Sequence, residues 1–357
     1  MKYYAKELSV NQNVKNTAGV KARDDLDMIL DQAGYSPLAV YSCRDKKYSG
    51  TAKKMKKQLD IYNAWVQASA PLRQGDVLFV QYPVKENSFL LPRLFHSLKR
   101  KGVILLLLVH DLSVLRLVKQ KDVGLAHRAN ILFTEMPVLK TADHVIAHNE
   151  IMCGHLAALG VEKDRLIPLE IFDYLIPGFD PARRTGKTGR DKPVIIAGNL
   201  RPVKSGYAYH LPENCAFNLY GIDYSGTLSA GSTYFGAFPP DEVPYAMEGS
   251  FGLVWDGDSA ETCTGIFGEY LKINNPHKTS LYLASGIPVA IWKQAALADY
   301  VVKNKAGIAV DSLAELRAAI DQLSEADYVE MAKNAESIGR RLRDGVFTKA
   351  ALEKAAL

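Results

Sequence analysis

The feature that most constrains the fold is a series of short apolar runs separated by segments of helical length. The longest run, "VILLLLV" (103–109), cannot span a bilayer, which needs about 20 residues. Runs of this kind are typical of parallel strands buried on both faces. In the first half we predict strands at 39–43, 76–83, 103–111, 144–149 and 165–172, and helices near 18–34, 51–67, 88–100, 124–141 and 150–159. This alternation predicts a doubly wound α/β domain.

A polar segment separates this alternation from a second one. Residues 176–193, "IPGFDPARRTGKTGRDKP", are rich in proline, glycine and charge, as linkers are. Strands are then predicted at 194–200, 216–222, 250–255, 287–292 and 306–310, and two closing helices near 325–343 and 348–356. We expect an N-terminal Rossmann-like domain (1–178), a linker (179–193), a C-terminal Rossmann-like domain (194–340) and a helical segment (341–357) that could pack back on the N-terminal domain.

Composition excludes several classes of protein. The 357 residues are 48% hydrophobic and 23% charged, as in ordinary globular chains. The formal net charge of +5 is too small to indicate a nucleic-acid partner. Four scattered cysteines lack metal-ligand or redox spacing, and the N-terminus lacks the apolar core of a signal peptide. We expect a cytoplasmic protein with reduced thiols.

The stretch "NNPHKTSLYLASGIPV" (274–289) predicts an anion site at a helix N-terminus. Asn275 suits the N-cap and Pro276 the first position of a helix that ends near 285. The free amides of such a terminus bind anions, most often phosphate. Lys278 would add a charge and His277 a donor. The alternative is a structural helix whose Lys278 is merely solvated.

Six segments, in order along nearly the whole chain, carry a resemblance to a known family. They are "NTAGVKARDDL" (16–26), "LVHDLSVLR" (108–116), "AGNLRPVKSG" (197–206), "FGLVWDGD" (251–258), "NNPHKTSLYLASGIPV" (274–289) and "RLRDGVFTKAAL" (341–352). Together they resemble bacterial GT-B glycosyltransferases, in particular galactofuranosyltransferases and the related glucosyltransferase that extends glycans on serine-rich adhesins. The resemblance implies two Rossmann-like domains facing across a cleft, a UDP-sugar donor, and a glycan acceptor that is lipid-linked or on a glycoprotein.

The resemblance also implies the donor site. In the relatives, the polar segment before the helix binds the nucleotide's phosphates, and the matching positions are Asn274, Asn275, Pro276, His277, Lys278 and Thr279. A basic residue after a Gly-Asn pair meets the diphosphate there, and either Lys204, which we prefer, or Arg201 matches it. Tyr220 matches a nucleotide-contacting aromatic position, although such a tyrosine is more often strand core.

The first landmark, "NTAGVKARDDL", lies where a first strand should pass into the first helix. Thr17 is the position that matches the relatives' loop facing the nucleotide sugar. Thr17 and Gly19 could let backbone amides approach a ligand, although an ordinary capped turn is an equal alternative. The segment is not a G-x-G-x-x-G, so it does not indicate a dinucleotide site.

The pair His110-Asp111 directly follows the most apolar predicted strand. Burying an unpaired carboxylate there is costly, so the pair needs a structural or chemical reason. Asp111 could accept the proton of an acceptor hydroxyl, with His110 beside the sugar. The alternative is that Asp111 caps the helix that starts near Leu112.

Two other motifs do not indicate chemistry. His144 and His148 have the spacing of a metal pair, but they lie on a predicted strand with no glutamate between them. Glu261 and Glu269 have the E-x7-E spacing of many retaining GT-B enzymes, but that motif would fall on Ile273 and Leu281. We therefore expect an inverting enzyme with no metal and no cofactor.

Basic residues gather between 85 and 140, as in "HSLKRKG" and "RLVKQKD". This region could touch an anionic membrane surface or simply be solvated helix faces.

Galactofuranose is the favoured transferred sugar, followed by glucose, and we expect a homo-oligomer. The alternative function is a non-catalytic nucleotide-sugar-binding subunit of a transferase, which would keep the phosphate site but not need Asp111.

Overall fold

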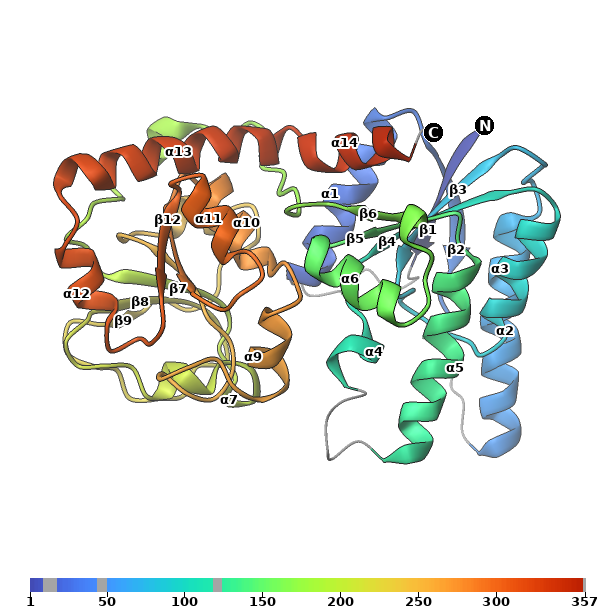
Figure 1. Ribbon diagram of the computed structural model, residues 1–357, viewed down its shortest axis with the longest axis horizontal. Helices are drawn as coiled ribbons and strands as arrows, with labels where there is room; N and C mark the ends of the chain where they lie inside the picture. Colours follow the sequence, from blue (N-terminus) through green and yellow to red (C-terminus); the bar gives the residue numbers. More distant parts are fainter. Residues whose placement is uncertain (9–17, 44–49, 118–123, 356–357) are drawn as a thin grey trace. The chain divides into compact units, whose positions relative to one another are not determined.

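The structure, a computed structural model, describes residues 1–8, 18–43, 50–117 and 124–355 (Figure 1). Contacts divide the chain into two compact units. Unit 1 comprises 1–15, 23–170 and 348–357, and unit 2 comprises 16–22 and 171–347. The division therefore falls after 170 rather than after 178, and the last ten residues group with unit 1.

Unit 1 contains a six-stranded parallel sheet in the order β2-β1-β3-β4-β5-β6. Its strands are β1 (Lys2–Leu8), β2 (Ser36–Tyr41), β3 (Val77–Tyr82), β4 (Ile104–Val109), β5 (His144–Ala147) and β6 (Leu166–Pro168). Every residue of β3 is buried, as the apolar runs predicted. The predicted strand list omits β1, because the charged residues Lys2, Lys6 and Glu7 interrupt the apolar residues of "KYYAKEL".

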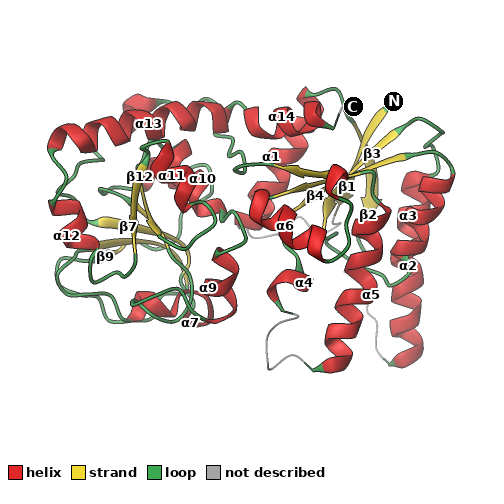
Figure 2. Cartoon of the chain, viewed as in Figure 1, coloured by secondary structure: helices red, strands yellow, loops and turns green. Residues whose placement is uncertain are grey.

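The helices of unit 1 cover both faces of this sheet (Figure 2). They are α2 (Thr51–Ser69), α3 (Leu91–Arg100), α4 (Ser113–Arg116), α5 (Leu125–Thr141) and α6 (Glu150–Ala158), together with most of α1 (Ala18–Gln32). A short 3-10 helix at Lys163–Arg165 precedes β6. Residues up to Ala22 of α1 group with unit 2.

Unit 2 contains a second six-stranded parallel sheet in the order β12-β11-β10-β7-β8-β9. Its strands are β7 (Val194–Asn199), β8 (Phe217–Ile222), β9 (Thr233–Tyr234), β10 (Gly252–Val254), β11 (Val289–Trp292) and β12 (Gly307–Val310). Its helices are α7 (Pro202–Ser205), α8 (Val243–Ala246), α9 (Gly265–Leu271), α10 (His277–Ala284), α11 (Ala298–Lys303), α12 (Leu316–Asp321) and α13 (Glu325–Arg343). Two 3-10 helices lie at Pro181–Arg184 and Gly206–Tyr209. The closing helix α14 (Val346–Lys354) begins in unit 2 and continues in unit 1.

Each sheet has one point at which the order of the strands reverses, so that later strands are added on the other side of the first one. In unit 1 this point lies between β1 and β3, and in unit 2 between β7 and β10. In open parallel sheets, ligands bind in the crevice outside the carboxyl ends of the strands at such a switch point. The loops that follow β7 and β10 are therefore the first place to search in unit 2.

Helix α10 is fixed over that switch point by Tyr282. The Tyr282 hydroxyl accepts a hydrogen bond from the backbone amide of Ala197 in β7 at 2.8 Å. A side chain at Gly252 in β10 would meet the Tyr282 ring at 2.1 Å, so only glycine allows the helix this close. The ring thus ties α10 to both strands at the switch point.

Among the described residues, no helix is both long and apolar enough to cross a bilayer.

Candidate functional site

Helix α10 begins one residue later than the sequence predicted. Pro276, with φ −70° and ψ 131°, is the N-cap and His277 is the first helical residue. Asn275 as N-cap and Pro276 as first helical residue were therefore wrong, because the extended ψ of Pro276 keeps it outside the helix. No side chain caps this terminus. The amides of the first turn are left for another partner, apart from that of Thr279, which bonds the Pro276 carbonyl at 3.0 Å.

Two polar atoms beside this terminus have no hydrogen-bond partner. The Thr279 hydroxyl is buried and unpaired, and so is the Oδ1 atom of Asn274. A buried polar group without a partner costs about 1–3 kcal/mol, so native proteins rarely leave one without a reason. Both atoms belong to positions that the sequence assigned to phosphate binding.

Lys278 is paired inside the protein. Its Nζ atom donates to the Trp255 carbonyl and to the Asp256 carboxylate, both at 2.8 Å. The side chains of Lys278 and Asp256 are only 12% and 8% exposed. Burial alone would lower the pKa of Lys278, but the neighbouring Asp256 carboxylate outweighs it and raises the pKa above its ordinary value. Lys278 is therefore charged, and Asp256 neutralises that charge.

His277 is a neutral donor rather than a cation. Burial, assisted by the positive charges of Lys204 and Lys21, lowers its pKa to about 4. Its ring lies against Phe172, with the ring centroids 4.4 Å apart. Lys21 is in turn held by the Leu175 carbonyl at 2.6 Å. The structure thus brings Lys21 and Lys204 near the first residue of α10.

Lys204 and Arg201 differ in how they are held. Arg201 is exposed and forms an ion pair with Asp223 at 2.6 Å. Within the described part of the chain, Lys204 has no anionic partner, and its Nζ atom lies 5.7 Å from the centroid of the Phe267 ring. Lys204 is therefore a cation near α10 that no described carboxylate neutralises.

The loops after β7 and β10 are joined at Gly257. The Gly257 amide donates to the Lys204 carbonyl at 3.0 Å. Gly257 has φ +105°, and a side chain there would meet the Thr264 carbonyl oxygen at 2.1 Å, so glycine is required. This contact fixes the backbone of α7, which carries Lys204.

The remaining donor-site positions are placed as follows. Tyr220 is buried in β8, stacks on Phe235 at 4.9 Å and accepts from the Glu248 amide at 3.0 Å. It thus occupies the strand core, as the alternative interpretation held. Gly19 is the second residue of α1, and Thr17 lies outside the described residues.

In unit 1, His110 belongs to a chain of polar contacts. Its Nε2 atom lies 2.7 Å from the Gln81 side-chain oxygen. The Gln81 amide donates to Asp27 at 2.6 Å, and burial raises the pKa of Asp27 to about 6. Since an amide oxygen can only accept, Nε2 of His110 carries the proton.

Asp111 follows β4 with one oxygen paired and one not. Its Oδ2 atom pairs with Arg116 at 2.6 Å, while Oδ1 is buried without a hydrogen-bond partner. The helix-cap alternative is wrong, because the N-cap of α4 is Leu112 and no side chain of the cap residue bonds the helix. The carboxylate of Glu135 in α5 instead accepts from the Ser113 and Val114 amides, at 3.1 and 2.8 Å.

Sequence reasoning missed several of these partners. Asp256 and Lys21 lie within two of the landmark segments, so their neighbourhood was marked but their roles were not. Gln81 and Glu135 gave no local signal, because each acts on residues more than 20 positions away.

The described residues contain no group of three or more histidine, cysteine or acidic side chains that could hold a metal ion. His144 lies on β5, as the sequence predicted. His148 follows that strand, and its Nε2 atom lies 3.1 Å from the carbonyl of His110.

Comparison with known proteins identifies the family. Two family models match, the glucosyltransferase 3-like N-terminal domain over 3–171 and its C-terminal domain over 194–355. The β-1,6-galactofuranosyltransferase WbbI of Escherichia coli is 35% identical over 79% of this chain and 80% of its own. The chain belongs to the glucosyltransferase 3-like family of glycosyltransferases.

Other relatives agree with this assignment. Glucosyltransferase 3 of Streptococcus parasanguinis is 24% identical over 95% of this chain and 93% of its own. Among solved structures, a sucrose-phosphate synthase from Thermosynechococcus elongatus covers 99% of this chain and 97% of its own, with a TM-score of 0.63 at 16% identity. The GT-B fold expected from the sequence is thereby confirmed, and the protein is a glycosyltransferase.

Proposed function

We propose that this glycosyltransferase moves galactofuranose, or failing that glucose, from a UDP-sugar to a sugar hydroxyl of a growing surface glycan. The relative named a galactofuranosyltransferase supports the choice of sugar, since it shares 35% of the aligned residues. The reaction would invert the anomeric centre and use no metal ion.

One observation carries the donor assignment. At the switch point of unit 2, the uncapped terminus of α10, the unpaired Thr279 hydroxyl and the uncompensated cation of Lys204 come together. Helix amides, a hydroxyl and an ammonium group are the donors that bind phosphate in proteins. Each lacks an anionic partner within the described residues, so a UDP diphosphate would satisfy all three.

The remaining donor-site residues complete the proposed site. His277 would donate one hydrogen bond to the diphosphate as a neutral imidazole, and Asn274 would accept one from a hydroxyl of the nucleotide sugar through its unpaired Oδ1 atom. Lys278, paired with Asp256, would add less charge than the sequence indicated and would mainly hold the loop after β10 against α10. Arg201 would play a lesser part, because Asp223 already neutralises it.

These groups would act on the leaving group. As the bond to the sugar breaks, negative charge grows on the UDP diphosphate, and fixed donors that need no rearrangement stabilise it. In this mechanism the protein supplies the stabilisation that a divalent ion supplies in other transferases, so no metal would be needed.

Asp111 would act on the acceptor. Its carboxylate, in a side chain that is 41% exposed, would accept the proton of the attacking hydroxyl, while Arg116 orients it through Oδ2. His110, whose tautomer Gln81 fixes, would lie beside the sugar. A single direct attack at the anomeric carbon inverts the configuration.

The test is to incubate the pure protein with a panel of UDP-sugars, with and without candidate acceptor oligosaccharides, and to measure UDP release. We expect release with UDP-galactofuranose that depends on an acceptor and persists in excess EDTA. Activity lost in EDTA and restored by Mg²⁺ or Mn²⁺ would contradict the metal-free mechanism. UDP binding without release from any sugar would instead favour the non-catalytic binding subunit.

A further inference from the structure

Helix α2 begins with a lysine cluster that has no anionic partner among the residues that the structure describes. Lys53, Lys54, Lys56 and Lys57 fall within its first two turns, and none of them forms an ion pair with a described residue. The first turn of α2 contains no acidic residue, and no side chain caps the helix.

This cluster opposes the stability of the helix. The N-terminus of a helix carries partial positive charge, so cations there are unfavourable. Lysines three or four residues apart also repel one another, at about 0.2–0.5 kcal/mol per pair. Because the arrangement costs stability within the chain, an external anion is the simplest reason for it.

The cluster continues the core-facing stripe of α2. Trp65 and Ile61 are buried in unit 1, and at helical spacing the same stripe reaches Gln58 and then Lys54. The stripe therefore changes from apolar to cationic where α2 leaves the core. There it borders a pocket of about 620 Å³.

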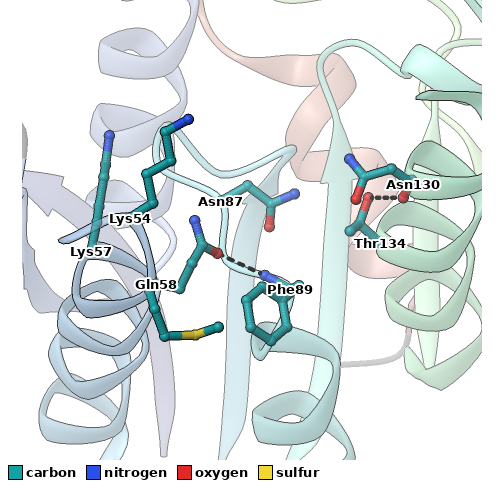
Figure 3. A pocket seen from close by; sticks show the side chains of 8 residues that line it. Lys54, Lys57, Gln58, Asn87, Phe89, Asn130 and Thr134 are labelled. Carbon is teal, nitrogen blue, oxygen red and sulfur yellow. Dashed lines mark hydrogen bonds between the residues drawn. The ribbon is translucent and has the colours of Figure 1, made fainter. Parts of the chain in front are cut away.

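The pocket combines cations with an apolar floor. It is lined by Lys54, Met55, Lys57, Gln58, Asn87, Phe89, Asn130 and Thr134. Figure 3 shows Lys54 and Lys57 on α2 on one side, Asn130 and Thr134 on α5 on the other, and Phe89 between them. Phe89 and Met55 are about half exposed, at 49% and 52%.

Large apolar side chains are also exposed on α5 beside this pocket. Phe133 is 77% exposed and directly precedes Thr134 of the pocket wall, and Leu125, in the first turn of α5, is 83% exposed. Exposed aromatic and aliphatic side chains among unpaired lysines are typical of surfaces that enter the headgroup region of a bilayer.

The position of this surface fits its chemistry. Helices α2 and α5 follow parallel strands β2 and β4, so both begin beyond the carboxyl edge of the sheet, the edge at which Asp111 lies. Figure 1 shows both helices extending from the sheet in the same direction. The basic end of α3 lies before β4, at the opposite edge, and its Lys99 is paired with Asp143.

We propose that Lys53, Lys54, Lys56, Lys57, Phe89 and Phe133 form a docking surface, the α2–α5 surface, for an anionic phospholipid bilayer. The ammonium groups would bind lipid phosphates while the aromatic rings enter the headgroup layer. Docking would turn the carboxyl edge of unit 1 toward membrane-bound acceptors. This places the membrane contact on α2 and α5 rather than on "HSLKRKG".

The test is sedimentation of the full chain with vesicles of phosphatidylcholine alone or mixed with phosphatidylglycerol. We expect binding only to the phosphatidylglycerol vesicles, and less binding as salt rises. The variant Lys53→Gln/Lys54→Gln should bind about 30-fold more weakly, from the ordinary contribution of two lysines near an anionic surface. Phe133→Ser should weaken binding roughly tenfold by removing an inserted ring.

The matched control is Arg100→Gln/Lys101→Gln, which removes the same charge from the end of α3. It should bind as the unmodified chain does, and equal weakening in both double variants would overturn the assignment to α2. No binding of the unmodified chain to phosphatidylglycerol vesicles at low salt would overturn the proposal itself. UDP affinity should be the same in every variant, so the result is independent of the proposed catalytic function.

Discussion

Each unit has an aspartate just after a strand of its sheet, paired with a cation, but the two pairs differ in burial. In unit 1, Asp111 after β4 pairs with Arg116 at 2.6 Å, and its side chain is 41% exposed. In unit 2, Asp256 after β10 pairs with Lys278 at 2.8 Å, and its side chain is 8% exposed. Chemically similar pairs thus lie in very different surroundings.

This difference in burial shows that forming an ion pair does not by itself say whether an aspartate has a structural or a catalytic role. An exposed ion pair contributes about 0–1 kcal/mol, so Asp111 has little structural reason to be there. Removing one partner of a buried pair costs about 3–5 kcal/mol because the other charge is left uncompensated, so loss of Lys278 or Asp256 alone should destabilise unit 2. We therefore expect substitution of Asp111 to affect turnover and substitution of Lys278 or Asp256 to affect folding.

The largest expected effect is at Asp111. Asp111→Asn should keep fold and UDP binding but lose roughly 10²–10⁴ in transfer rate, because an amide cannot accept the acceptor's proton. Initial rates of UDP release with acceptor would measure it, with thermal melting as the control for fold. Near-normal transfer by a folded variant would remove Asp111 from the chemistry.

The next effect is on the stability of unit 2. Lys278→Ala should lower the free energy of unfolding by about 3–5 kcal/mol, because it leaves the Asp256 carboxylate buried and unpaired. The double variant Lys278→Ala/Asp256→Ala should be less destabilised than the sum of the two single variants. Urea unfolding of the set would show this coupling, and additive losses would mean that the pair is not a structural unit.

Lys204 and Arg201 extend the comparison to two cations of unit 2, one without a described anionic partner and one paired with Asp223. Lys204→Ala should weaken UDP binding by about 1.5–3 kcal/mol, the usual contribution of a hydrogen bond to a charged group. Arg201→Ala is the matched control and should have a small effect, because Asp223 already neutralises that charge. Calorimetric titration with UDP would measure both, and the reverse ranking would assign the diphosphate to Arg201.

The smallest expected effect is on pH dependence, and it has opposite signs in the two units. The pKa of His277 is lowered to about 4, so as pH falls below about 6.5 the unfolded chain binds the proton first and stability decreases. The pKa of Asp27 is raised to about 6, so in the range from about 6 to 4 the native state binds more protons and stability increases.

Substitution separates these two contributions. His277→Gln should remove a loss on the order of 1–2 kcal/mol between pH 7 and pH 4.5, whereas Asp27→Asn should remove a gain of similar size. Urea unfolding at the two pH values would measure each. Equal pH dependence in His277→Gln and the unmodified chain would show that His277 is not held neutral by its surroundings.

The sequence predicted the alternation of both sheets because long apolar runs report burial directly, as in β3 and β4. Its list of strands omits β1, an interior strand between β2 and β3 that reads "KYYAKEL". The ammonium groups of Lys2 and Lys6 lie near the Tyr35 ring and the Asp27 carboxylate, so an interior strand can carry charged residues. The one-residue error at Asn275 has a local cause, the extended backbone of Pro276.

The sequence by itself determined the fold class, the two-part organisation and the segments in which a site could lie, because periodicity and landmark residues are local. The partners of each candidate side chain were decided only by the tertiary structure. Asp256 neutralises Lys278 from 22 residues away, and Glu135 takes the capping role that Asp111 could have had, from 21 or 22 residues away. Charge and hydrogen bonding depend on distance in space, and the fold sets that distance between residues far apart in the chain.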